Sequence, residues 1–93
     1  MSFRLEFHPD ALAEWRKLDA TVSAQFKKKL VERLEHPRVQ SAKLTGHPDR
    51  YKIKLRSVGY RLVYEVRDAV LVVLVVAVGK RERSAVYRVA EKR

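Results

Sequence analysis

Four cations lie close together in residues 51–61, and this segment contains no carboxylate. Lys52, Lys54 and Arg56 alternate with apolar residues, so a strand would carry all three on one face. If residues 56–59 form a hairpin loop, Lys54 faces Arg61 across the strand pair. Facing like charges destabilise a sheet. A solvated basic face is the simpler interpretation, but the missing acids and the facing pair favour a functional site.

A crowded group of cations suits the cleavage of RNA, because RNA supplies its own nucleophile, the 2′-hydroxyl. The reaction needs a base for that hydroxyl, positive charge near phosphorus and help for the departing 5′-oxygen. A lysine acts as a base when neighbouring cations and partial desolvation lower its pKa. Lys54 beside Lys52 and Arg61 fits this role. Arginine is a poor acid, but its guanidinium binds phosphate in a bidentate way.

A second basic segment follows the most apolar stretch of the chain and contains Lys80, Arg81 and Arg83. If the last three strands form a meander, this segment ends beside the hairpin, and we expect it to complete the basic patch. Tyr87 follows and could fold over this surface, although a lone tyrosine is more often a packing residue.

The sequence excludes several other kinds of site. It has no cysteine, which rules out disulfides, thiolate zinc sites and cysteine nucleophiles. Its three histidines lie in the first half and share no motif, and its carboxylates are scattered. We therefore expect no metal ion and no cofactor. The longest apolar run, residues 70–78, is half of a membrane span, and residues 1–10 do not resemble a signal peptide. We expect a cytoplasmic protein without membrane contact.

Length and composition predict one small domain over residues 1–93. The 93 residues are 46% hydrophobic, which is enough for a packed core. The net charge of +10 favours a polyanionic partner, most often a nucleic acid.

The hydrophobic periodicity predicts an α+β fold. Alternation over residues 3–7 indicates a strand, and a helix should follow from Pro9 to about Leu18. A second helix, capped by Thr21 and closed by Pro37, should bury a stripe of residues spaced by four, with Val31 packed beside it. The stripe is Val22, Phe26, Leu30 and Leu34.

The rest of that helix and the chain after it complete the expected fold. Lys27, Lys28 and Arg33 should form its solvated face or, as the alternative, a secondary patch that binds the nucleic-acid backbone. A loop over residues 36–50 precedes the hairpin, whose strands are 51–55 and 60–66. A buried strand over residues 70–78 and a short helix capped by Ser84 follow. The element order is β-α-α-β-β-β-α, a compact single domain in which two helices pack on one face of a four-stranded, largely antiparallel sheet.

Four segments resemble the RelE toxins of bacterial toxin–antitoxin pairs: EWRKL, FKKKLVERLEHPR, YKIKLRSVGYRLVYEV and VGKRERSAVY. The resemblance extends over nearly the whole chain. It implies the RelE-like microbial RNase fold and a ribosome-dependent, metal-free endoribonuclease that cuts mRNA in the decoding site. It also implies a RelB-type antitoxin that wraps the toxin. The pair would bind operator DNA only through the antitoxin complex.

The resemblance assigns roles by position. It implies Lys54 as the general base, and Arg61 with Lys52 as contacts to the phosphate and the transition state. It implies Arg81 as the stabiliser of the leaving oxygen or its proton donor. Tyr87 is implied as the group that stacks on or orients the nucleotide. We expect Arg56, Lys80 and Arg83 to add RNA contacts. Thr45 stands where RelE toxins can carry a further arginine. The related YoeB branch uses a C-terminal histidine, whereas no histidine follows His47 here.

Two other interpretations use the same basic face. A non-catalytic module that binds RNA or the ribosome would block translation by occupancy, without new mRNA 5′ ends. A docking surface for an acidic partner is compatible with the nuclease, because an antitoxin that covers the site would occupy it.

Overall fold

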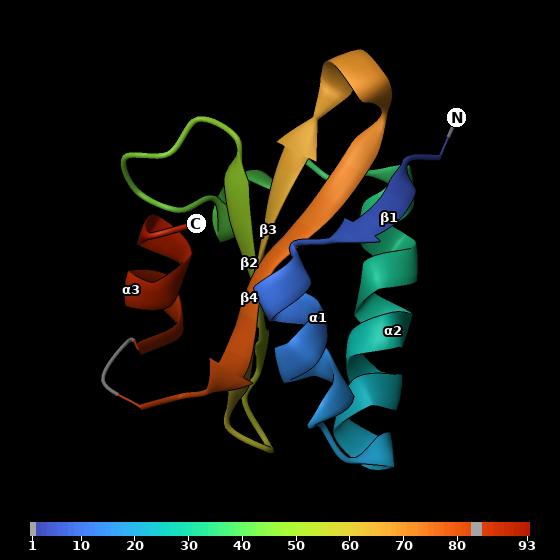
Figure 1. Ribbon diagram of the computed structural model, residues 1–93. Helices are drawn as coiled ribbons and strands as arrows, with labels where there is room; N and C mark the ends of the chain where they lie inside the picture. Colours follow the sequence, from blue (N-terminus) through green and yellow to red (C-terminus); the bar gives the residue numbers. More distant parts are fainter. Residues whose placement is uncertain (1, 83–84) are drawn as a thin grey trace.

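The computed structural model describes residues 2–82 and 85–93, and its four-stranded sheet has helices on both faces (Figure 1). The elements are β1 (Arg4–Phe7), α1 (Pro9–Arg16), α2 (Ala20–Glu35), β2 (Arg50–Leu55), β3 (Tyr60–Arg67), β4 (Val72–Lys80) and α3 (Ala85–Glu91). Single 3-10 turns lie at Gln40–Ala42 and Asp68–Val70. The predicted α+β class and element order are confirmed.

The strands are arranged in the order β1-β4-β3-β2, so the last strand of the chain lies inside the sheet. The pairs β2–β3 and β3–β4 are antiparallel, and β1 joins β4 in parallel. The sheet is thus largely antiparallel, as expected. β1 is short and reaches only Val75 of β4, which leaves the end of β4 near Lys80 without a strand on that side.

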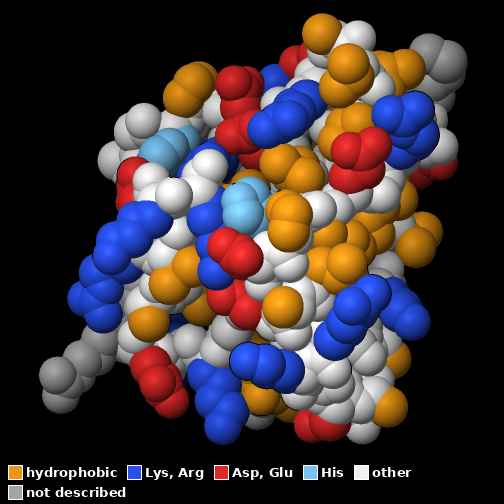
Figure 2. Space-filling model, viewed as in Figure 1, with side chains coloured by type: hydrophobic (Ala, Val, Ile, Leu, Met, Phe, Trp, Pro, Cys, Tyr) orange, Lys and Arg blue, Asp and Glu red, His pale blue; other side chains and the backbone are white. Residues whose placement is uncertain are grey.

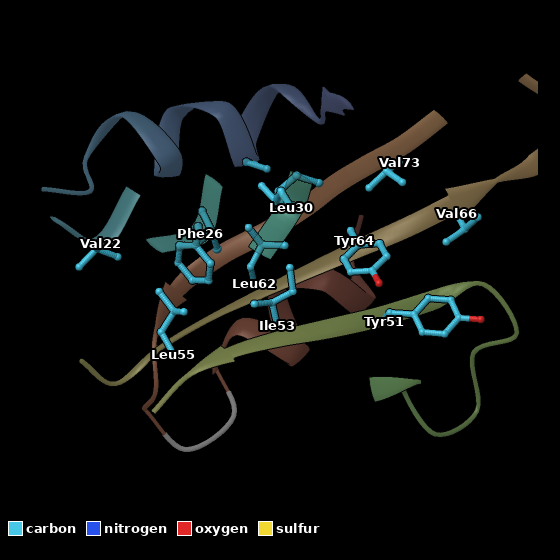
Figure 3. Close-up of a cluster of buried hydrophobic side chains, with 13 residues drawn as sticks. Val22, Phe26, Leu30, Tyr51, Ile53, Leu55, Leu62, Tyr64, Val66 and Val73 are labelled. Atoms are coloured by element: carbon cyan, nitrogen blue, oxygen red, sulfur yellow. The ribbon is translucent and has the colours of Figure 1, made fainter. Parts of the chain in front are cut away.

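Two separate cores lie on the two faces of the sheet. On one face, α1 and α2 cover a cluster that includes Phe26, Leu30, Ile53, Leu62 and Tyr64, all at most 2% exposed (Figure 3). On the other face, α3 packs on β3 and β4 through a smaller cluster. That cluster comprises Val63, Val76, Ala77, Val86 and Ala90. β4 contributes to both cores, which explains its nearly continuous apolar sequence.

The beginnings of α1 and α2 are fixed by side-chain caps. The His8 Nδ1 atom accepts a hydrogen bond from the backbone N–H of Asp10 at 3.1 Å, and Pro9 occupies the first turn. Asp19, rather than the predicted Thr21, caps α2, because its Oδ1 atom accepts from the Val22 N–H at 2.8 Å. A carboxylate at this end also complements the helix dipole.

Several details of the sequence-based prediction were wrong. α1 ends at Arg16, two residues earlier than expected. Val31 is 64% exposed, because it lies about 100° around α2 from buried Leu30. Arg33 is not solvated surface: its guanidinium donates to the Tyr64 hydroxyl at 2.9 Å and to the carbonyl of residue 52 at 3.2 Å.

The last strand begins later in the chain than the sequence predicts. The strand expected over residues 70–78 begins at Val72, because Leu71 adopts a left-handed conformation with φ of 54°. Val70 is accordingly exposed. The expected cap Ser84 lies outside the described residues. Within the described part of the chain, the helices lack the length and apolar character needed to cross a membrane.

Candidate active site

The hairpin formed by β2 and β3 positions the central cations. Its register pairs Lys54 with Arg61 and Leu55 with Tyr60, as the sequence predicts. The loop closes through a hydrogen bond from the Gly59 N–H to the Leu55 carbonyl at 2.9 Å. Gly59 has a φ of 69°, a conformation that favours glycine. Because directly paired residues share a face, Lys54 and Arg61 lie together on the face that carries α3.

Arg81 reaches the same place from the end of β4. Its backbone N–H donates to the Gly59 carbonyl at 2.6 Å, which ties the segment after β4 to the hairpin loop. A hollow of about 180 Å³ lies at this junction. Four of its lining residues are cations, namely Lys54, Arg56, Arg61 and Arg81. No Asp or Glu among the described residues lines this hollow. Figure 2 shows Lys and Arg side chains around the lower end of the molecule, where Figure 1 places the hairpin loop.

The electrostatics of this basic hollow act on Lys54. The positive charge of Lys52 lowers the pKa of the Lys54 ammonium below its ordinary value, and partial desolvation contributes. Smaller repulsions come from Arg61, Arg56 and Arg81. All of these effects disfavour the protonated amine, so they increase the fraction of Lys54 that can accept a proton. Lys52 does not line the hollow, but it lies on the same face of β2.

Tyr87 lies beside the hollow on α3. Its ring covers the guanidinium of Arg61, with 5.3 Å between the Arg61 Cζ atom and the ring centroid. Gly79, which pairs with Arg61 across the strands, makes room for α3 here: a Cβ at this position would lie 3.3 Å from the Val86 Cγ2 atom. The Tyr87 hydroxyl is buried and has no hydrogen-bond partner among the described residues.

Three contacts hold the C-terminal end of α3, and none of them was predicted from the sequence. Arg50 donates to the Ala90 carbonyl at 2.6 Å, and the imidazole of His47 pairs with Glu91. Arg93 donates twice to the Glu14 carboxylate, at 2.9 Å each, and also to the carbonyl of residue 76. These residues are far apart in sequence, so no periodic pattern connects them.

Not every expected site residue reaches the basic hollow. Lys80 pairs with Tyr60 in the sheet, so its side chain lies on the α1 side rather than with Lys54 and Arg61. The expectation that it shares their patch is wrong, because the pleat alternates and Lys80 is one residue beyond Gly79. Arg83 lies outside the described residues. Thr45 lines a different hollow, in the loop before β2.

Among residues 2–82 and 85–93, no three His, Asp or Glu side chains gather closely enough to hold a metal ion. The side chains that line the basic hollow supply amine and guanidinium groups, which bind and neutralise a phosphate and, through Lys54, accept a proton.

The sequence and the fold of this chain match those of a known class of toxins. The family described as "ParE toxin of type II toxin-antitoxin system, parDE" matches residues 5–85. The protein named mRNA interferase toxin RelE from Escherichia coli K12 is 62% identical over 93 residues, which are all of this chain and 98% of the relative. The chain therefore belongs to the RelE toxins within this family.

Solved structures agree with this assignment. A mutant of E. coli RelE with two arginine-to-alanine substitutions, in the free state, matches with a TM-score of 0.92 and 60% identity over 100% of this chain and 98% of that one. The toxin of the intact E. coli RelBE toxin–antitoxin complex matches with a TM-score of 0.84 and 61% identity, over 88% of this chain and 100% of that one.

Proposed function

We propose that residues 1–93 form a single RelE-like toxin domain that acts as an mRNA interferase in the cytoplasm. It would cleave mRNA in the decoding site of the ribosome and so stop translation. Its whole-length identity of 62% to a protein named mRNA interferase toxin RelE supports this activity. The observation that carries the chemistry is the carboxylate-free hollow in which Arg61 and Arg81 adjoin Lys54, whose pKa is lowered.

In the proposed mechanism, the neutral amine of Lys54 takes the proton of a 2′-hydroxyl. The 2′-oxygen then bonds to the adjacent phosphorus while the bond from phosphorus to the 5′-oxygen breaks. Arg61 and Lys52 neutralise the charge that grows on the phosphate oxygens. Arg81 stabilises or protonates the departing 5′-oxygen. The products are a 2′,3′-cyclic phosphate and a 5′-hydroxyl, and Tyr87 orients the nucleotide. No step needs a metal ion.

The partners follow from the same family. E. coli RelE forms a complex with RelB, and we infer a RelB-type antitoxin for this chain. The positive net charge and the basic hollow suit both a ribosome and an acidic protein segment. Operator DNA would be bound only through the toxin–antitoxin complex. Arg56 and Arg83 would add contacts to RNA near the cut.

The test is the double variant Lys54→Ala/Arg81→Ala in a translation extract, with mRNA 5′ ends mapped by primer extension. Loss of a general base alone lowers a rate by about 10²–10⁴-fold, so new 5′ ends should disappear. The matched control is Lys27→Ala/Lys28→Ala, which removes the same two charges from the exposed face of α2 and should cleave normally.

Two results would contradict the proposal. Unchanged cleavage by the Lys54→Ala/Arg81→Ala variant would remove the mechanism. A block of translation by the wild-type protein without any new 5′ end would make the protein a binder that acts by occupancy. Cleavage should also persist when EDTA removes transition metal ions while excess free magnesium keeps the ribosome intact, whereas its loss would show that such an ion takes part and would contradict the metal-free route.

A further inference from the structure

A second basic hollow adjoins the candidate active site on the opposite face of the sheet. It has a volume of about 190 Å³ and lies where α1 ends beside the end of β4. Its lining includes Lys17 and Lys80 with the ring of Tyr60. Tyr60 also lines the first hollow, and Lys80 immediately precedes Arg81, which lines it too. The two hollows are therefore neighbours on either side of Tyr60. Tyr60 is the first residue of β3 after the hairpin loop, which Figure 1 shows at one end of the molecule.

The second hollow is positively charged despite the presence of Glu14 in its lining. The Glu14 carboxylate accepts two hydrogen bonds from Arg93 and one from the Val78 N–H at 3.1 Å, so a cation already offsets its charge. Within the described residues, neither Lys17 nor Lys80 has a carboxylate within ion-pairing distance. Lys17 lies at the negative end of the α1 dipole, which it partly offsets. Lys80 is thus the cation most available to a ligand.

The polarity of the proposed reaction indicates which part of an RNA would reach Lys80. Lys54 on β2 meets the 2′-hydroxyl of the upstream nucleotide, and Arg81 after β4 meets the 5′-oxygen of the downstream nucleotide. The strand therefore runs 5′ to 3′ from β2 toward the end of β4. On this path Tyr60 on β3 lies between β2 and β4, and Lys80 at the end of β4 lies beside Arg81 on the downstream side of the cut.

From this placement we propose that the Lys17–Tyr60–Lys80 hollow binds the mRNA phosphate one linkage 3′ of the cleaved one. Lys80 supplies the main charge, Lys17 adds to it, and half-buried Tyr60 separates this phosphate from the reacting one. Such a contact grips the leaving strand and holds its 5′-oxygen in line with the attacking 2′-oxygen. The proposal rests on the proposed nuclease function and adds to it a binding site for the downstream nucleotide.

The experiment combines a protein change with an RNA change. Cleavage of ribosome-bound mRNA is measured for the wild type and for Lys80→Gln, on natural mRNA and on mRNA whose next linkage 3′ of the cut is an uncharged methylphosphonate. On natural mRNA, Lys80→Gln should lower kcat/KM about fivefold, the upper range for a solvent-exposed ion pair. On the methylphosphonate, the two proteins should cleave equally, because the partner of Lys80 has lost its charge.

Matched controls identify the source of any effect. Lys28→Gln removes an equal charge from exposed α2 and should cleave both RNAs as the wild type does, whereas Lys80→Arg should retain most of the activity on natural mRNA. A methylphosphonate 5′ of the cut should leave the Lys80→Gln defect in place. Equal thermal unfolding of the variants shows that they fold.

Three outcomes would overturn the proposal. Lys80→Gln could cleave natural mRNA as fast as the wild type. Its defect could persist on the 3′ methylphosphonate, which would mean that Lys80 meets another anion, such as ribosomal RNA. The wild type could fail to cleave any mRNA, and only in that case would the proposed function fail as well.

Discussion

Replacing Lys54 with glutamine should stabilise the protein while it abolishes cleavage. The side chain pairs directly with Arg61 across the strands, and the surrounding charges that lower its pKa are all positive. A favourable cross-strand pair contributes about 0.2–1 kcal/mol, and a facing like-charge pair costs a similar amount. Removing the repulsion should therefore raise the free energy of unfolding by up to about 1 kcal/mol. For a chain of this length, that is a rise in Tm of at most about 4–8 °C.

The assay is urea unfolding at low and at high salt. The gain should be largest at low ionic strength and should nearly vanish at about 1 M salt, where the Debye length is about 3 Å. The gain should also shrink at high pH. The folded pKa of Lys54 lies below its unfolded value, so the unfolded state binds more protons between the two, and wild-type stability rises with pH there. The Lys54→Gln variant has no such rise in stability with pH, so its advantage over the wild type becomes smaller.

Arg67→Gln is the matched control for the Lys54 experiment. Arg67 is an exposed cation on the same sheet, but it donates to Glu65 at 2.8 Å, so its removal loses an attraction and should bring no gain. The reasoning would be refuted if Lys54→Gln unfolded at a lower urea concentration than the wild type at low salt. An equal gain for Arg67→Gln would refute it as well, because total charge rather than the facing pair would then be the cause.

Two further predictions concern other parts of the structure. Lys52→Gln removes the largest cause of the lowered pKa of Lys54. The pH–rate profile of cleavage should therefore move to higher pH, and the cleavage rate at pH 7 should fall. An unmoved profile would argue against Lys54 as the base. Tyr64→Phe should lower the free energy of unfolding by about 1–3 kcal/mol, because the buried hydroxyl donates to Pro37 at 2.6 Å and accepts from Arg33 at 2.9 Å. A loss well below that range in urea unfolding would mean that water satisfies both partners.

The hairpin and its register were predictable from the sequence because a strand's side chains alternate strictly. Once residues 56–59 form the loop, the pairing of Lys54 with Arg61 follows, and the structure confirms it. The class, the element order and the sheet with two helices on one face could be predicted for the same reason, since each element has its own period. The role of the paired residues in catalysis stays a prediction.

The parts that could not be predicted depend on contacts between distant residues or on a shift of one position. The expectation that Lys80 shares a face with Lys54 and Arg61 failed because the sequence does not show where the pleat of β4 ends relative to the basic segment. The cap at Asp19 was missed since both Asp and Thr are good caps. The anchoring of α3 by Arg50 and Arg93 links residues that only the folded chain brings together.

The pleat also explains how this chain tolerates its repulsive cluster. Leu55 and Leu62 point from the hairpin into the main core, while Lys54 and Arg61 point from the same strands to the other face. The core contacts that hold the strands together are therefore independent of the charges beside the basic hollow. An acidic segment bound in the basic hollow would both block it and relieve the repulsion among its cations. The free energy of unfolding of the protein should therefore rise as the hollow is filled. An antitoxin whose acidic segment occupied the basic hollow would therefore stabilise the toxin at the very residues proposed to cut RNA.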